Sequence, residues 1–206
     1  MADSFKIDIE INRLSSSHIN SVVEIHLRAF PDFFLSFLGS RFLREFYASF
    51  LVDPQGVGFV ASSSAGQILG VIVGPVDPRG YFNRLLKRRW WKFCMASIAA
   101  VVQRPSCMPR LFRAVFYRGE SPSGVQRALL SSIAVDPNVQ SVGVGKKLVE
   151  HWLKEVQRRG ATGCFLTTDA EGNEKVNQFY QGLHWRIDSV YLTPEGRRMH
   201  RYVYDF

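Results

Sequence analysis

Apolar residues in the first third of the chain recur with the spacings of strands and helices. Residues 5–12 alternate apolar and polar positions, which is typical of a half-buried strand. Residues 18–29 and 33–52 carry apolar side chains every three or four positions, which predicts two amphipathic helices. Pro31 lies between them and ends the first helix, because proline cannot continue a helix. Residues 56–76 then predict a β-hairpin with a turn rich in serine and glycine.

The clearest pattern lies between residues 127 and 185. An apolar strand over 129–135 leads through a glycine-containing turn into a helix with a single apolar stripe, which begins near Val144. That helix ends with basic residues followed by Gly160, which are typical of a helix C-terminus. A second apolar strand follows over 164–168. A strand, a helix and a strand joined in this way predict two parallel strands.

Two glycines and a lysine mark the start of this helix. The first N–H groups of a helix have no partner within the helix and carry partial positive charge, so they attract anions such as phosphate. Gly143 and Gly145 remove side chains where a diphosphate would approach the backbone, and Lys146 adds a positive charge. An alternative interpretation is that these glycines bind no phosphate and only let the turn close and the helix pack on the sheet.

Two groups of residues in this stretch carry a resemblance to a known family. The first is the turn Gln140-x-x-Gly143-x-Gly145, which follows the strand end Val135-Asp136-Pro137. The second consists of Asn173, Phe179-Tyr180 and Leu183-His184-Trp185, which are similar to the family's segment N-x-x-A-x-x-x-Y-x-x-x-G-F. In this order and separation, they resemble the GNAT superfamily of acetyl-CoA-dependent N-acetyltransferases.

The resemblance implies an α/β fold over residues 1–206 as a single GNAT-like domain. Its sheet would be mixed, mostly antiparallel and twisted, with a central parallel β-α-β unit and helices on both faces. Residues 186–192 and 198–206 supply two further strands around a turn. Residues 79–118 are expected to be a basic, apolar helical insertion.

The resemblance also implies the residues of the site. The pantetheine arm of acetyl-CoA would lie along the strand that ends at Val135, whose N–H would stabilise the oxyanion, and the turn would hold the diphosphate. The implied cofactor-binding residues are Ile133, Ala134, Val135, Gln140, Ser141, Val142, Gly143, Val144, Gly145, Lys146, Asn173 and Asn177. Tyr180 is the predicted catalytic residue, which would give a proton to the departing thiolate.

The general base stays open at this point. Many relatives offer a carboxylate near the start of the strand equivalent to 129–135, where this chain has Ser131 and Ser132. The remaining candidates are Glu120, His26, Asp136 and His184. His184 also stands where the family usually has glycine, which predicts a strained turn if the backbone there needs a positive φ.

The net charge of +8 has its source in the insertion. Residues 79–118 hold ten Lys or Arg residues and no Asp or Glu. Three interpretations stay open: helices whose apolar side packs on the protein, a surface that attracts phosphorylated ligands, and interfacial membrane binding. The uncharged apolar run 93–102 is too short to span a bilayer. No nucleic-acid binding is expected, because no motif for it accompanies the charge.

The remaining composition points to an intracellular setting. The first eleven residues lack the basic start and apolar block of a secretory signal. The three cysteines are scattered without metal-ligand spacing, so no metal site and a cytoplasmic location are expected. A homodimer and a peripheral membrane contact are left open, and the membrane contact is not favoured.

Two functions follow from these observations. The first is an N-acetyltransferase that moves acetyl from acetyl-CoA directly to a primary amine of a small molecule, with a nucleotide-linked amino sugar as one such acceptor. The resemblance implies that the junction at Pro31–Phe34 borders the acceptor pocket, where its aromatic residues would stack on a ring. The alternative is a non-catalytic acyl-CoA-binding sensor, or a protein that docks to a membrane or partner through residues 79–118.

Overall fold

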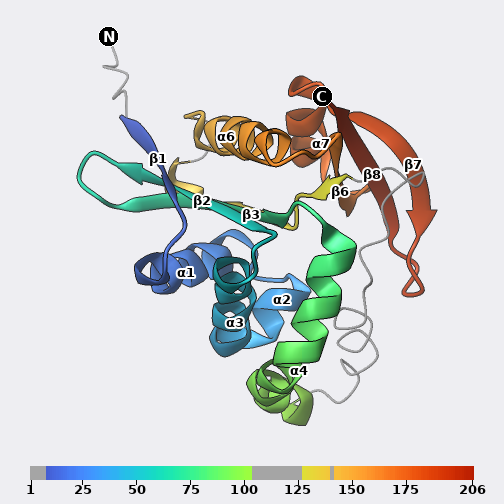
Figure 1. The fold of residues 1–206 in the computed structure, drawn as a ribbon. Coiled ribbons are helices and arrows are strands. Elements are labelled where there is room, and N and C mark those ends of the chain that lie inside the picture. Colours follow the sequence, from blue (N-terminus) through green and yellow to red (C-terminus); the bar gives the residue numbers. More distant parts are fainter. Residues whose placement is uncertain (1–7, 104–126, 140–141) are drawn as a thin grey trace.

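The computed structural model describes residues 8–103, 127–139 and 142–206. Its strands form two sheets of four strands each (Figure 1). The first has the order β1 (Ile9–Arg13), β2 (Gly56–Ser63), β3 (Ile68–Pro75) and β5 (Ser132–Val135), and all its neighbours are antiparallel. The second has the order β4 (Ala128–Leu129), β6 (Gly163–Asp169), β8 (Arg198–Asp205) and β7 (Arg186–Leu192). Only β4 and β6 are parallel within these described sheets.

The two sheets meet where the predicted strand 129–135 divides into β4 and β5. The Leu130 N–H donates to the Phe165 carbonyl on β6, and the next residue, Ser131, donates its N–H to the Val73 carbonyl on β3. Successive residues thus bond to different sheets, so β5 continues along β3 and leaves β6. The parallel β-α-β unit is present, but its parallel pairing is confined to two residues of β4.

Helices cover both faces of the first sheet (Figure 1). On one face lies α6 (Val144–Arg158), and α7 (Glu174–Gly182) lies beside it. On the other face lie α1 (Ile19–Ala29), α2 (Phe34–Phe37) and α3 (Gly39–Val52). Short 3-10 turns at Ser16–His18 and Pro137–Val139 lead into α1 and follow β5. This arrangement confirms the predicted fold class.

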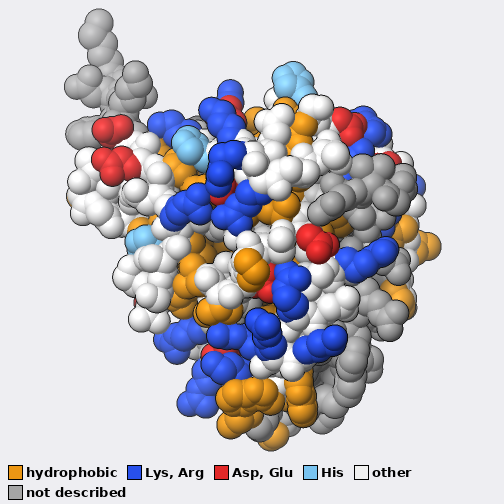
Figure 2. Space-filling model, in the orientation of Figure 1, with side chains coloured by type: hydrophobic (Ala, Val, Ile, Leu, Met, Phe, Trp, Pro, Cys, Tyr) orange, Lys and Arg blue, Asp and Glu red, His pale blue; other side chains and the backbone are white. Residues whose placement is uncertain are grey.

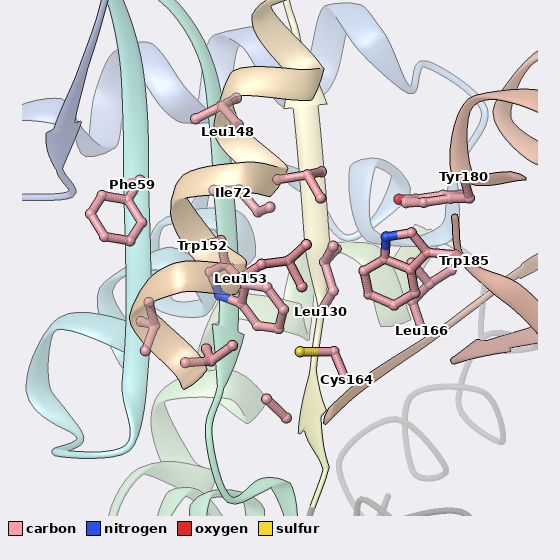
Figure 3. Close-up of a cluster of buried hydrophobic side chains, with 14 of the residues drawn as sticks. Phe59, Ile72, Leu130, Leu148, Trp152, Leu153, Cys164, Leu166, Tyr180 and Trp185 are labelled. Atoms are coloured by element: carbon pink, nitrogen blue, oxygen red, sulfur yellow. The ribbon is translucent and has the colours of Figure 1, made fainter. Parts of the chain in front are cut away.

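The core follows from the alternation of side chains along β2 and β3. Phe59 and Ile72 point to the face where Leu148 and Trp152 of α6 pack (Figure 3). Val60 and Val71, their neighbours in sequence, point the other way and pack with α1 and α3. Because both faces are covered, both strands are apolar along nearly their whole length.

The helix predicted over 33–52 is wrong as a single element. Gly39 has a φ of +88°, which no continuous right-handed helix allows, and the chain forms the short α2 before α3. The predicted apolar stripe is nevertheless buried, with Phe42 and Phe50 each 4% exposed.

The part of the insertion that the structure describes is one helix, α4 (Pro78–Gln103), and residues 104–118 lie outside the described ranges. Its inner side packs on α3. The Phe93 and Phe42 rings meet edge to face with centroids 5.2 Å apart, and the Tyr81 and Ser49 hydroxyls are hydrogen-bonded. Among the helices described, none is both long and apolar enough to cross a membrane.

Candidate active site

A cavity of about 810 Å³ lies where β5 separates from β6. Its walls combine residues of both sheets with the start of α6, with α7, and with the segment from α1 to α2. The cavity therefore joins the two regions that the sequence assigned separately, the glycine turn and the aromatic helix junction.

The start of α6 lines one end of this cavity. Gly143 precedes the helix with a φ of +89°, and the first helical hydrogen bond runs from the Lys147 N–H to the Gly143 carbonyl. The N–H groups of Val144, Gly145 and Lys146 therefore have no partner within the helix. No acidic residue lies in this first turn, so the positive end of the helix dipole is uncompensated.

Gly145 also fixes how close α7 can come. A Cβ placed on it would lie 3.3 Å from Cζ of Phe179, a tight contact. The glycine thus lets α7 pack closely on α6, which is one of its two expected purposes, and its role toward a diphosphate stays a prediction. Gly143, Val144, Gly145 and Lys146 line the cavity, whereas Gln140 and Ser141 lie outside the described residues and exposed Val142 does not line it.

β5 provides a strand edge along the cavity. The Asp136 N–H donates to the Leu69 carbonyl on β3, and in an antiparallel pair the bonded residues alternate. The N–H of Val135 is therefore directed away from β3, toward the gap that opens before β6. Ile133 and Val135 line the cavity, while the side chain of Ala134 is buried among α1 and α3.

Tyr180 lies on α7 in the wall opposite β5. Trp185 and Tyr202 pack against its ring, each with centroids 5.8 Å away. Figure 3 shows its hydroxyl directed toward the strand that carries Leu130. Burial raises the pKa of Tyr180, so the phenol keeps its proton at neutral pH. Among the residues described, this hydroxyl has no hydrogen-bond partner.

The two predicted asparagines have different surroundings. Asn173 lines the cavity, and its amide donates to Thr168 Oγ1 at 2.7 Å. Asn177 does not line the cavity. Its Nδ2 donates to the carbonyls of Asp169 and Asn173, and its Oδ1 accepts from Tyr202 Oη at 3.0 Å and lies 3.1 Å from Nδ1 of His200. Asn177 therefore ties α7 to β6 and β8, and we do not include it among residues available to a ligand.

Among the base candidates, Asp136 and His184 lie away from the cavity lining. The N–H of Asn138, together with Arg28 at 2.6 Å, holds the pKa of Asp136 below its usual value. His184 has a φ of +64°, so the backbone does adopt the conformation that favours glycine in the resembled family. Glu120 lies outside the described residues.

Of the base candidates in the described part of the chain, His26 is the one that lines the cavity. Its Nδ1 lies 2.7 Å from Tyr47 Oη, which in turn lies 3.4 Å from Ser132 Oγ. Its Nε2 is buried with no hydrogen-bond partner among the described residues. Burial lowers the pKa of His26 to about 4, so the imidazole is uncharged at neutral pH and is a weak base. The hydrogen bonds that link His26, Tyr47 and Ser132 could not be predicted from the sequence. Tyr47 and Ser132 are 85 positions apart, and Tyr47 belongs to an apolar stripe.

The other end of the cavity is apolar and aromatic. Phe30, Phe33 and Leu35 line it, and Phe33 is 41% exposed. Phe34, which the sequence placed in the same group, instead packs with Leu38 and Phe42. Phe30 was not singled out from the sequence, although it stands next to the predicted Pro31–Phe34 junction.

The described residues contain no group of three or more His, Cys, Asp or Glu side chains that could hold a metal ion. The residues that line the cavity instead offer backbone N–H groups, hydroxyls, the amides of Asn173 and Gln178, and the ammonium groups of Lys146 and Lys175. Such donors suit an anionic and carbonyl-bearing ligand.

Comparison with known proteins agrees with this arrangement. The model of the acetyltransferase (GNAT) family matches residues 19–185, which include the sheet junction, the helix start and Tyr180. The chain belongs to the GNAT family. This family uses acetyl-CoA, and the cavity of this GNAT protein has the open helix start and the strand edge that such a ligand needs.

Individual curated relatives match a shorter part of the chain than the family model does. The alanine N-acetyltransferase of ribosomal protein bS18 from Escherichia coli K12 is 32% identical over 77 residues, which cover 35% of this GNAT protein and 51% of that enzyme. The chain thus spans about half the length of the curated relatives it matches.

Solved structures match over nearly the whole chain. The E. coli ribosomal-protein-S18-alanine N-acetyltransferase has a TM-score of 0.60 at 17% identity, covering 96% of this GNAT protein and 94% of that chain. Arabidopsis thaliana NAA60 in complex with acetyl-CoA has a TM-score of 0.60 at 14% identity, covering 97% and 99%. At such identities, these likenesses show the fold.

Proposed function

We propose that this protein transfers acetyl from acetyl-CoA directly to the primary amine of a small molecule. The observation that carries this proposal is the position of the Tyr180 hydroxyl. It is protonated, has no partner among the described residues, and lies in one cavity with the N–H groups of β5 and α6.

The residues around the cavity fit the parts of acetyl-CoA. The N–H groups of Val144, Gly145 and Lys146 would hold the diphosphate. The edge of β5 at Ile133 and Val135 would pair with the amides of the pantetheine arm, and Asn173 would contact the same arm. When bound, acetyl-CoA supplies a thioester whose carbonyl carbon accepts the amine.

Two protein groups act on the transfer in this proposal. The Val135 N–H donates to the carbonyl oxygen, where negative charge develops. The nitrogen–carbon bond forms and the carbon–sulfur bond breaks, and Tyr180 gives its proton to the sulfur. The attacking nitrogen loses one proton, which replaces the proton of Tyr180 through water in the cavity, so the transfers balance.

Ser132 is placed to orient the amine. Its hydroxyl lies in the cavity wall and is held by Tyr47, which His26 holds in turn. Because His26 is uncharged at neutral pH, these three hydrogen-bonded side chains add no positive charge near the amine, which must itself be uncharged to react. Ser132, Tyr47 and His26 therefore position the amine, and they do not replace the carboxylate that serves as general base in many relatives.

The acceptor end supports an amine attached to a ring. Phe33 is partly exposed and Phe30 lies beside it, with ring centroids 5.9 Å apart, so both offer aromatic surface for stacking. A nucleotide-linked amino sugar has such rings and remains our proposed acceptor. The name of the E. coli relative suggests a protein N-terminus beginning with alanine as the main competitor.

The test is thiol release from acetyl-CoA with a panel of amines, followed by mass spectrometry of the acetylated product. The panel contains nucleotide-linked amino sugars, polyamines, amino acids and peptides beginning with alanine. We expect release with a ring-bearing small amine. Release only with peptides would refute the acceptor proposal, and tight acetyl-CoA binding without release for any amine would favour a sensor instead.

A further inference from the structure

The outer surface of α4 is a second feature that the acetyl-transfer chemistry does not use. We propose that this surface docks the protein on a membrane that contains anionic lipids. We define the α4 outer surface by the exposed side chains of Lys87, Arg88, Trp90, Trp91 and Met95.

The inner side of α4 is fixed to the protein, so the outer surface has a defined orientation. Tyr81 and Phe93 are 1% and 6% exposed. Arg84 donates to both carboxylate oxygens of Asp53, each at 2.7 Å. Burial alone would raise the pKa of Asp53, but the hydrogen bonds from Arg84 and the Gln55 N–H outweigh it and lower the pKa, so this pair stays ionised.

The opposite side leaves large apolar side chains in water. Trp90, Trp91 and Met95 expose 56%, 49% and 63% of their surface. Trp91 and Met95 are four positions apart, so they lie one turn apart on the same side of the helix. Figure 2 shows hydrophobic side chains gathered at the end of the molecule that α4 forms, with Lys and Arg beside them.

Basic side chains accompany these apolar groups. Lys87 lies four positions before Trp91, and both Lys87 and Arg88 are exposed. Lys92 Nζ lies 5.6 Å from the centroid of the Trp91 ring. Tryptophan beside Lys and Arg on one helix face is the combination that settles at the headgroup layer of a bilayer, where the rings are partly buried and the cations meet lipid phosphates.

Charge distinguishes a bilayer from a second copy of this chain. A symmetric dimer through this surface would bring Lys87 and Arg88 of two copies together, and residues 79–118 contain no Asp or Glu that would compensate them. An anionic bilayer supplies the opposite charge over the whole surface. Since α4 is not apolar enough to span a membrane, the contact would be peripheral.

The experiment is flotation of the full chain with vesicles of phosphatidylcholine and phosphatidylglycerol, compared with vesicles of phosphatidylcholine alone. We expect flotation with the anionic vesicles and loss of it at high salt. Trp90→Ser with Trp91→Ser should weaken binding at least tenfold. Lys87→Gln with Arg88→Gln should also weaken it at least tenfold, since each basic residue near such a surface is worth about fivefold.

The matched control is Val190→Ser with Leu192→Ser on β7, whose side chains are 45% and 69% exposed, and it should leave binding unchanged. Intrinsic fluorescence tests the wild type without any variant. Of its four tryptophans, Trp152 and Trp185 are 0% and 2% exposed, so brominated lipids should quench Trp90 and Trp91.

Three results would overturn the proposal. They are absence of flotation with either vesicle, binding that neither α4 double variant changes, and a dimer in sedimentation velocity that the Trp90→Ser, Trp91→Ser variant dissolves. The last result would assign the surface to a second copy.

Discussion

At the residue scale, Tyr180 combines a fixed ring with a free hydroxyl. Trp185 and Tyr202 hold the ring in the core. The hydroxyl points toward the strand that carries Leu130 (Figure 3), and both residues line the cavity. A tyrosine that was purely part of the core would be expected to direct its hydroxyl to a protein partner, as Tyr202 does toward Asn177.

Tyr180→Phe should therefore lower turnover at least about tenfold while the affinity for acetyl-CoA stays within about twofold, because only the proton donor is lost. Steady-state thiol release and calorimetric titration measure the two quantities. Tyr204→Phe removes a hydroxyl elsewhere in the last strand and is the control. Unchanged turnover in Tyr180→Phe would remove Tyr180 from the mechanism.

His26 predicts a pH dependence of stability. Its pKa falls from 6.5 in the unfolded chain to about 4 in the fold, because burial disfavours the imidazolium. Between these values the unfolded state binds more protons, so stability decreases as the pH falls from 6.5 toward 4. From pH 7 to pH 5, the free energy of unfolding should lose about 2 kcal/mol through this residue.

Urea denaturation at pH 7 and pH 5 measures this loss. His26→Gln should reduce it, whereas Tyr47→Phe, which keeps His26 buried, should retain it. Glu155, whose pKa the hydrogen bond from Arg158 and further bonds from Arg159 and Arg13 lower to about 2, loses its contribution only at lower pH. If the wild type and His26→Gln lost the same free energy of unfolding between pH 7 and pH 5, His26 would not be the source of the pH dependence.

Residues close together in sequence could be predicted, and residues joined by the fold could not. Gly143, Gly145 and Tyr180 belong to short motifs whose spacing the sequence displays. The contact of His26, Tyr47 and Ser132 depends on α1, α3 and β5 meeting at one edge of the cavity. No periodicity within any of these elements marks that contact.

At the element scale, Gly145 lets α7 come close to the start of α6. Gly145→Val would place a branched side chain against Phe179, where even a Cβ lies 3.3 Å from Cζ, and would cover the free N–H groups. The Kd for acetyl-CoA should rise at least about tenfold, or about 1.4 kcal/mol. Calorimetry measures it, with Lys154→Val on the exposed face of the same helix as the control. Equal affinities would place the diphosphate elsewhere.

The two sides of α4 should differ in their effect on stability. Phe93 is 6% exposed and packs on Phe42, so Phe93→Ala should cost about 3 kcal/mol in the free energy of unfolding. Met95 is 63% exposed, so Met95→Ala should change it by less than about 0.5 kcal/mol. Urea denaturation compares the two, and similar costs would mean that the inner side of α4 is not core.

The predicted helices and strands were correct where the local hydrophobic pattern and the packing around the segment favour the same secondary structure. The hairpin, the helix after the glycine turn and the last two strands are present. The break at Gly39 and the division of 129–135 into β4 and β5 could not be predicted, since they depend on packing and on which sheet offers a partner to Leu130 and Ser131. An apolar run is compatible with either one strand or two.

At the scale of the whole molecule, the site exists because two sheets separate. The first sheet supplies β5 and the second supplies β6, with α7 following β6 in the chain, and the cavity between them extends from the start of α6 to the aromatic end. The basic α4 lies outside this arrangement at another end of the molecule (Figure 1). The central claim is therefore that one extended ligand bridges the two sheets.

The most direct test is a crystal structure with a non-hydrolysable thioether analogue of acetyl-CoA. We predict its diphosphate on the N–H groups of Val144 to Lys146, its carbonyl oxygen at the Val135 N–H, and its sulfur within hydrogen-bond distance of the Tyr180 hydroxyl. An analogue bound on α4, or one bound in the cavity with its sulfur away from Tyr180, would contradict this account.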